Sequence, residues 1–105
     1  MAYIKNEDYS EQDLIVARFM KAMSHPARIV ILQYLSPLNE CSCCFNELSK
    51  ILPISKSTIS QHLKVLKDAG LILGRIEPPY MQYCINRENW AIVKKLFFAI
   101  AKIKQ

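Results

Sequence analysis

The residues whose side chains are best suited to binding a partner lie between Ser55 and Gly70. If this segment is a helix, hydroxyl, amide and ammonium groups share one face, opposite an apolar stripe that must pack on a core. No acidic residue precedes Asp68 in the segment. Such groups contact phosphates and base edges in the major groove of DNA. The segment therefore predicts a DNA-reading helix, with contacts from Lys56, Ser57, Thr58, Ser60, Gln61 and Lys64.

A second group of residues that could be reactive or bind a metal is the cysteine cluster at Cys41, Cys43 and Cys44. As thiolates these residues could bind a soft metal or metalloid ion, or they could form a redox switch. The alternative is that Cys44 packs as a small apolar residue and the others are inert. In a continuous helix Cys43 would point away from the other two, so a three-thiolate site requires non-helical backbone before Phe45, or a cysteine from a partner subunit.

Four other residues have simpler interpretations. His62 is expected to be packed and hydrogen-bonded rather than base-reading, and His25 to stand at a helix start. Cys84 is expected to pack in a strand. Trp90 is expected to contact the core or a dimer partner.

The elements around the reading helix form a recognisable order. A short helix over 45–52 ends at Pro53, and Ser55 caps the DNA-reading helix. Residues 44–69 are therefore predicted to form a helix-turn-helix. Gly70 has the position of a C′ glycine that ends the helix. Strand-like segments at 71–76 and 80–85 flank a turn at 77–79, which makes 71–86 a wing carrying Arg75.

The first and last helices share a surplus of apolar faces. Ser10 opens a helix that should reach Met23, and Asn86 opens another over 87–104. A helix on a single core needs only one apolar face. We therefore expect 10–23 and 87–104 to form a homodimer interface.

Composition restricts the class of protein. The chain has 105 residues, a formal net charge of +5 and 51% apolar residues, which suits one small domain with a polyanionic partner. No signal peptide or membrane-spanning run is visible. We expect a cytoplasmic protein without membrane contact, whose four cysteines are reduced thiols. The sequence lacks the combinations of residues that an enzyme would need.

Taken together, the chain resembles the ArsR (arsenical-resistance repressor) family of winged-helix regulators over roughly residues 12–102. The similarity includes 29–35, 68–72 and the pair Gln82-Tyr83. Its two main motifs are Phe19-Met20-Lys21-Ala22-Met23-Ser24-His25-Pro26-Ala27-Arg28 and Ser57-Thr58-Ile59-Ser60-Gln61-His62-Leu63-Lys64-Val65-Leu66.

This resemblance implies a mostly helical winged helix-turn-helix fold of about five helices, and a homodimeric transcriptional repressor. It also implies that the face from Lys56 to Lys64 enters the major groove, while the wing around Arg75 approaches the backbone or minor groove. Many members release double-stranded DNA on binding a metal or metalloid ion. The alternative function is a thiol-based metal-handling or redox protein without operator binding.

The metal sites of the family do not map cleanly onto this chain. Cys44 and Asn46 stand where the thiolate sensor of the family has Cys-x-Cys, and Cys41-Ser42-Cys43-Cys44 is displaced upstream. The last helix has no histidine, so the zinc site that some members carry there is not expected. The release signal therefore stays open between a soft ion and thiol oxidation, and the third alternative is a regulator whose ligand site has been lost.

Overall fold

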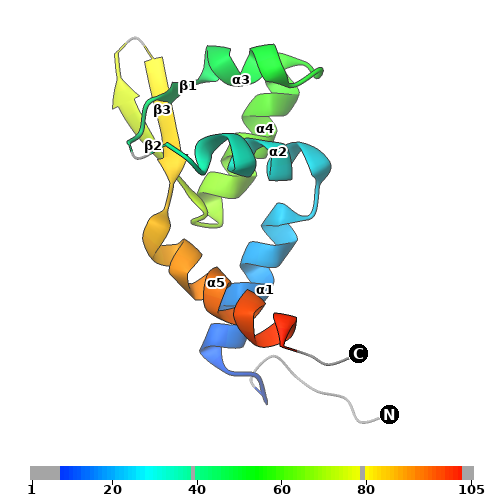
Figure 1. Cartoon of the computed structure of the whole chain (residues 1–105). Coiled ribbons are helices and arrows are strands. Elements are labelled where there is room, and N and C mark those ends of the chain that lie inside the picture. Colours follow the sequence, from blue (N-terminus) through cyan, green and yellow to red (C-terminus); the bar gives the residue numbers. More distant parts are fainter. Residues whose placement is uncertain (1–7, 39, 79, 103–105) are drawn as a thin grey trace.

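Five helices and a three-stranded antiparallel sheet make up the fold in the computed structural model, which describes residues 8–38, 40–78 and 80–102 (Figure 1). The fold class predicted from the sequence is confirmed. The elements in chain order are α1 Glu11–Met23, α2 Pro26–Leu35, β1 Cys43–Cys44, α3 Phe45–Ile51, α4 Lys56–Asp68, β2 Ile72–Glu77, β3 Tyr80–Ile85 and α5 Arg87–Ala101.

Four of the helices begin at a side chain that caps a free backbone N–H. The predicted caps are all present: Ser10 Oγ accepts from Asp13, His25 Nδ1 from Ala27, Ser55 Oγ from Thr58 and Asn86 Oδ1 from Asn89. Each such cap typically stabilises a helix by about 1 kcal/mol. The positions of the helices are therefore set largely by local sequence.

The core lies where α4 meets the other helices. Ile59, Leu63 and Leu66 of α4 are almost wholly buried, so the predicted apolar stripe faces the core. They join Leu48 of α3 and Leu35 of α2 in one cluster. Burying side chains of this size contributes about 1.5–3 kcal/mol each, which holds the opposite face of α4 outward.

Gly70 ends α4 and joins it to α5. Its φ of 86° lies in the left-handed region, as expected for a C′ glycine. Asn89 of α5 donates a hydrogen bond from Nδ2 to the Gly70 carbonyl oxygen at 2.8 Å. A Cβ at position 70 would lie 2.8 Å from the same nitrogen, so the close contact also requires glycine.

The sheet has the order β1-β3-β2 and contains a strand that the sequence did not predict. The β2–β3 hairpin is the predicted wing, with Arg75 opposite Gln82. The additional strand, β1, pairs Cys43 with Tyr83 and Cys44 with Gln82. Of the predicted turn, Pro79 lies outside the described residues.

At the end of the molecule opposite α3, α1 and α5 lie side by side (Figure 1). Both helices carry large apolar side chains in contact with solvent: Leu14 on α1, and Phe97, Phe98 and Ile100 on α5. Phe98 is 70% exposed. The α5 helix ends at Ala101, and residues 103–104 of its predicted range lie outside the described part.

Candidate nucleic-acid interface

The outer face of α4 carries five of the six side chains predicted to read DNA from this helix. Lys56, Ser57, Ser60, Gln61 and Lys64 are all exposed. The sixth, Thr58, is half-buried, and its Oγ1 lies 2.8 Å from Ser55 Oγ in the helix cap. The structure thus gathers the first five on one surface and gives Thr58 a role at the helix start.

One of these residues has a partner within the helix. Lys64 Nζ lies 3.4 Å from Asp68 Oδ2, and both side chains are largely exposed. Exposed pairs of this kind contribute about 0–1 kcal/mol. Lys64 can therefore exchange Asp68 for a phosphate at small cost.

One cationic residue that the sequence did not predict as part of the interface, Lys67, lies between α4 and the wing. Lys67 and Lys64 line an open cavity of about 300 Å³ together with Tyr83 of β3. A Cβ at Gly74 of β2 would lie 3.2 Å from Lys67 Nζ, so this lysine extends over the wing. Glycine within a strand often marks a close approach by another group, and Gly74 was the available signal.

Arg75 stands on the exposed surface of β2, one residue beyond Gly74. The wing also exposes Ile76 and Tyr80 near its tip. The predicted wing contact is therefore on the solvent side of the hairpin, as a contact with nucleic acid requires.

His62 faces inward from α4, as predicted. It is 7% exposed, and its Nδ1 accepts a hydrogen bond of 3.1 Å from Arg28 Nε. The ring of His25 lies 4.5 Å from that of His62, measured between centroids. Burial, followed by the charges of His25 and Arg28, lowers the pKa of His62. The imidazole is a packed acceptor and does not belong to the exposed polar face of α4.

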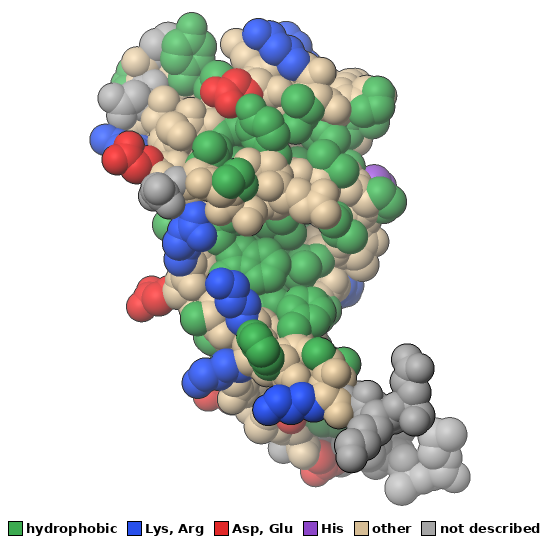
Figure 2. Space-filling model, viewed as in Figure 1, with side chains coloured by type: hydrophobic (Ala, Val, Ile, Leu, Met, Phe, Trp, Pro, Cys, Tyr) green, Lys and Arg blue, Asp and Glu red, His purple; other side chains and the backbone are tan. Residues whose placement is uncertain are grey.

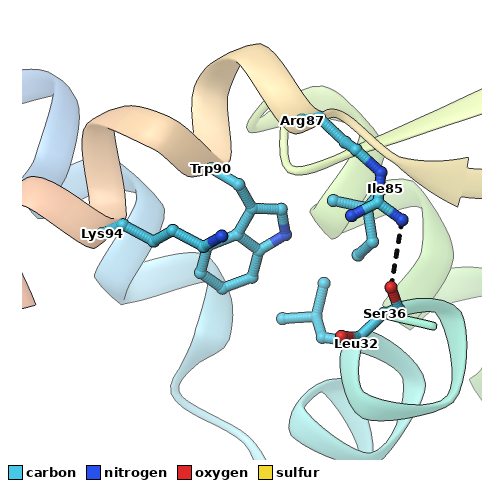
Figure 3. A pocket seen from close by; sticks show the side chains of 6 residues that line it. All are labelled: Leu32, Ser36, Ile85, Arg87, Trp90 and Lys94. Atoms are coloured by element: carbon cyan, nitrogen blue, oxygen red, sulfur yellow. Dashed lines mark hydrogen bonds between the residues drawn. The ribbon is translucent and has the colours of Figure 1, made fainter.

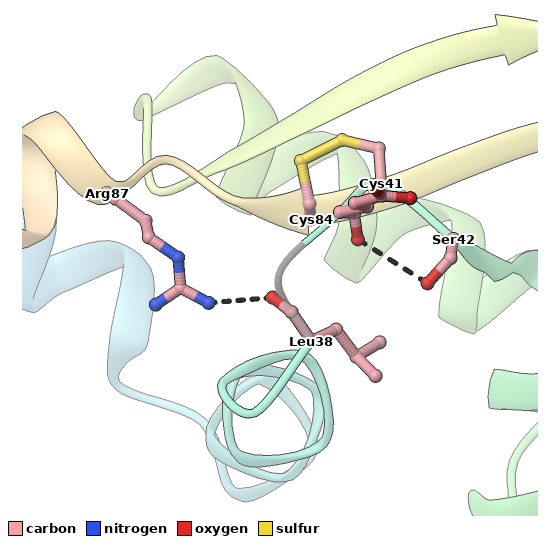
Figure 4. Close-up of a disulfide and its surroundings, with 6 residues drawn as sticks. Leu38, Cys41, Ser42, Cys84 and Arg87 are labelled. Carbon is pink, nitrogen blue, oxygen red and sulfur yellow. Dashed lines mark hydrogen bonds between the residues drawn. A yellow bond between two sulfur atoms is a disulfide. The ribbon is translucent and has the colours of Figure 1, made fainter.

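The cysteines differ from the expectation of four reduced thiols. Cys41 and Cys84 form a disulfide, with Cα atoms 4.4 Å apart, that connects the segment after α2 to β3 (Figure 4). The sequence could not show this contact because the two residues are separated by 43 positions. Cys84 is therefore covalently paired as well as packed, which corrects its sequence interpretation.

The other two cysteines are free and lie in different surroundings. Cys43 is buried, and its pKa is raised to about 12 by burial and by the nearby Glu47 and Cys44. Cys44 is half-buried, with its Sγ 3.8 Å from Glu47 Oε1. The non-helical backbone required before Phe45 is present as β1.

In this disulfide-bonded state, however, the predicted site at Cys41, Cys43 and Cys44 is not assembled. Among the described residues, no three His, Cys, Asp or Glu side chains lie close enough to hold a metal ion. A three-thiolate site would first require reduction of the bond between Cys41 and Cys84.

The comparisons with known proteins agree with this geometry. A family model described as "Bacterial regulatory protein, arsR family" matches residues 25–73. The chain is 40% identical to the HTH-type transcriptional regulator YgaV of Escherichia coli over 69% of its own length and 71% of that protein. It is 31% identical to a homolog of the cadmium resistance regulatory protein CadC from Staphylococcus aureus, over 87% and 75% of the two chains.

The fold also matches solved structures. One is the homodimeric winged helix-turn-helix domain of Mb0332 from Mycobacterium bovis, with a TM-score of 0.70, 27% identity and coverage of 96% and 90% of the two chains. No helix in the described part of our chain has the length and apolar character to cross a membrane.

Proposed function

This chain belongs to the arsR family of bacterial regulatory proteins, and on that premise we propose that it represses transcription by binding double-stranded DNA as a homodimer. It would act by binding rather than by catalysis. The observation that carries the proposal is the division of α4 into a buried apolar stripe and an exposed polar face without acids before Asp68. A helix held in this way can enter a major groove as a rigid element.

Each residue of the interface has a distinct role in the proposal. Gln61 and Ser60 would contact base edges, because amide and hydroxyl groups can donate and accept at the same base pair. Lys56 and Lys64 would contact phosphates, and Arg75 would approach the backbone or minor groove from the wing. Thr58 would hold the first turn of α4 in place through Ser55.

The proposed dimer would use the apolar surface of α1 and α5. Leu14, Phe97, Phe98 and Ile100 are exposed there in the single chain, and exposed apolar side chains of this size favour association. A two-fold dimer places one α4 in each half of a palindromic site.

Of the two release signals left open by the sequence, the disulfide between Cys41 and Cys84 supports thiol oxidation. The bond constrains β3, which forms the wing and leads directly into α5. We propose that the reduced dimer binds the operator more tightly than the oxidised one.

The test is a DNA-binding titration with a duplex selected from a random pool by the reduced protein. Fluorescence anisotropy would be measured at several salt concentrations, before and after oxidation. Binding should be sequence-dependent, should weaken steeply with salt because phosphates are contacted, and should weaken on oxidation. Failure to enrich any sequence would contradict a role as a sequence-specific repressor.

A further inference from the structure

Between α2 and α5 lies a groove that the DNA-binding function does not use. It consists of two adjoining cavities of about 240 and 300 Å³, which share Leu32, Ser36 and Trp90. Figure 2 shows hydrophobic side chains gathered between these two helices, with Lys and Arg side chains along the α5 side. The groove lies on the face of the molecule that Figures 1 and 2 show.

The walls of the groove are mainly apolar. Trp90 of α5 is half-buried and projects toward Leu32 of α2, and Ile85 at the end of β3 lies beside them (Figure 3). Met23 and Ile29 extend the apolar wall into the second cavity. A flat aromatic surface with aliphatic neighbours is suited to an apolar or aromatic ligand body.

The rim of the groove is cationic. Arg87 and Lys94 stand three residues before and four residues after Trp90, so all three share one face of α5 (Figure 3). Within the described part of the chain, none of the residues lining either cavity is acidic. The two positive charges are therefore not neutralised by the walls of the groove, and they favour an anionic ligand.

We propose that this groove binds a small organic monocarboxylate with an aromatic body. The ring packs against Trp90 and Leu32, and the carboxylate is held between Lys94 and Arg87. Charge-assisted hydrogen bonds from guanidinium and ammonium groups to a carboxylate provide the polar recognition that such mainly apolar sites need.

Ligand binding in this groove would affect the DNA-binding elements through Arg87. The Nη2 atom of Arg87 donates to the carbonyl oxygens of Ser36 at 3.0 Å and Leu38 at 2.7 Å, which ties α5 to the end of α2. A carboxylate is a stronger acceptor than a neutral carbonyl and competes for the same guanidinium. The ligand thereby shifts the end of α2 relative to α5, and α2 packs against α4. This regulatory step rests on the proposed repressor function, whereas ligand binding itself does not.

The chain has a single tryptophan, which reports on this groove directly. The emission of Trp90 would be followed while the protein is titrated with 3-phenylpropionate, with excitation at a wavelength that this probe does not absorb. A saturable change in emission is expected. The neutral amide of the same acid has the same ring, so it should bind more weakly.

Two variants separate recognition of charge from simple burial of the ring. Lys94→Gln should weaken phenylpropionate binding about twofold to fivefold, as loss of one exposed ion pair does, and should leave amide binding unchanged. Lys95→Gln is the matched control because Lys95 is the next residue of α5 and does not line either cavity. Circular dichroism would verify that each variant is folded.

The proposal is overturned if phenylpropionate gives no saturable change, including the case in which a partner subunit covers the groove. Equal affinities for acid and amide would overturn it as well, because the cationic rim would then have no role. Operator binding with and without phenylpropionate tests the regulatory step separately. If the protein binds the probe but no DNA, the repressor function fails and the ligand site stands.

Discussion

Arg28 and His62 form a hydrogen bond of 3.1 Å that joins the first turn of α2 to the middle of α4. The same guanidinium donates from Nη1 to the carbonyl oxygen of Ala22 at 3.1 Å, near the end of α1. One side chain therefore connects three helices behind the exposed polar face of α4. The orientation of α4 depends on this polar contact as well as on its buried leucines.

Replacing Arg28 with leucine should lower the free energy of unfolding by about 1–3 kcal/mol, because His62 Nδ1 and the Ala22 carbonyl would lose their donor. Urea denaturation of the protein at fixed concentration measures the change. Arg18→Leu is the control, since Arg18 is exposed on α1. Equal losses in the two variants would contradict the role of Arg28.

Stability should also fall as the pH drops below about 6.5, the ordinary pKa of histidine. Because the pKa of His62 is lowered in the folded protein, the unfolded chain takes up a proton first. The stabilisation is complete above the unfolded pKa and is lost as the pH falls toward the folded one. His62→Gln should flatten this part of the pH profile of unfolding. An unchanged slope in the variant would assign the effect to other groups.

Gln61→Ala should cost about 1–3 kcal/mol in operator affinity and should relax the preference for the selected sequence. The comparison is made with selected and scrambled duplexes in the anisotropy assay. Asn46→Ala, which changes an exposed amide on α3, is the control. If Gln61→Ala weakens binding to both duplexes equally, Gln61 does not read a base.

Lys56→Ala, Lys64→Ala and Lys67→Ala should each weaken binding to every duplex, because phosphate contacts carry no sequence information. Each should reduce the slope of log affinity against log salt by about 1. The control Lys50→Ala lies on α3 and should leave the slope intact. If Lys56→Ala, Gln61→Ala and Lys64→Ala combined keep full operator affinity, α4 is not the reading helix.

Reducing the disulfide between Cys41 and Cys84 should lower the free energy of unfolding by about 2–4 kcal/mol, since the bond closes a long loop in the unfolded chain. Cys84→Ser should reproduce that loss and abolish any response of operator affinity to oxidation. Cys44→Ser leaves the bond in place and serves as the control. A full oxidation response in Cys84→Ser would exclude this disulfide as the signal.

Phe98→Glu should convert the proposed dimer to a monomer at micromolar concentration, because a charge would be buried at the interface of α1 and α5. Multi-angle light scattering measures the mass. Ile76→Glu is a control of similar exposure on the wing, where Ile76 is 74% exposed, and it should leave the mass unchanged.

Local signals predicted much of this fold. Ser10, Ser55 and Asn86 are caps within three residues of the N–H groups that they accept from, so the helix starts could be found from short patterns. The inward position of His62 followed from its place beside the apolar stripe. The hydrogen bond that His62 makes with Arg28 could not be predicted, because Arg28 is 34 positions away in the sequence.

The features that escaped sequence reasoning depend on tertiary contacts. A strand of two residues such as β1 has no recognisable period, and it exists because β3 supplies its hydrogen bonds. The partner of Cys41 is brought near by the same pairing. The groove at Trp90 likewise requires α2 and α5 to be placed together, so the sequence predicted only a core or dimer contact for Trp90.

The contact between Gly70 and Asn89 has a consequence for the range of operators. It joins the end of α4 to α5, so a pivot of α4 relative to the helix through which the proposed dimer forms would break this hydrogen bond. The separation of the two α4 helices is then determined at the contact between subunits. Operators whose half-sites are spaced differently would then require either the loss of this hydrogen bond or a new packing of α5 against its partner.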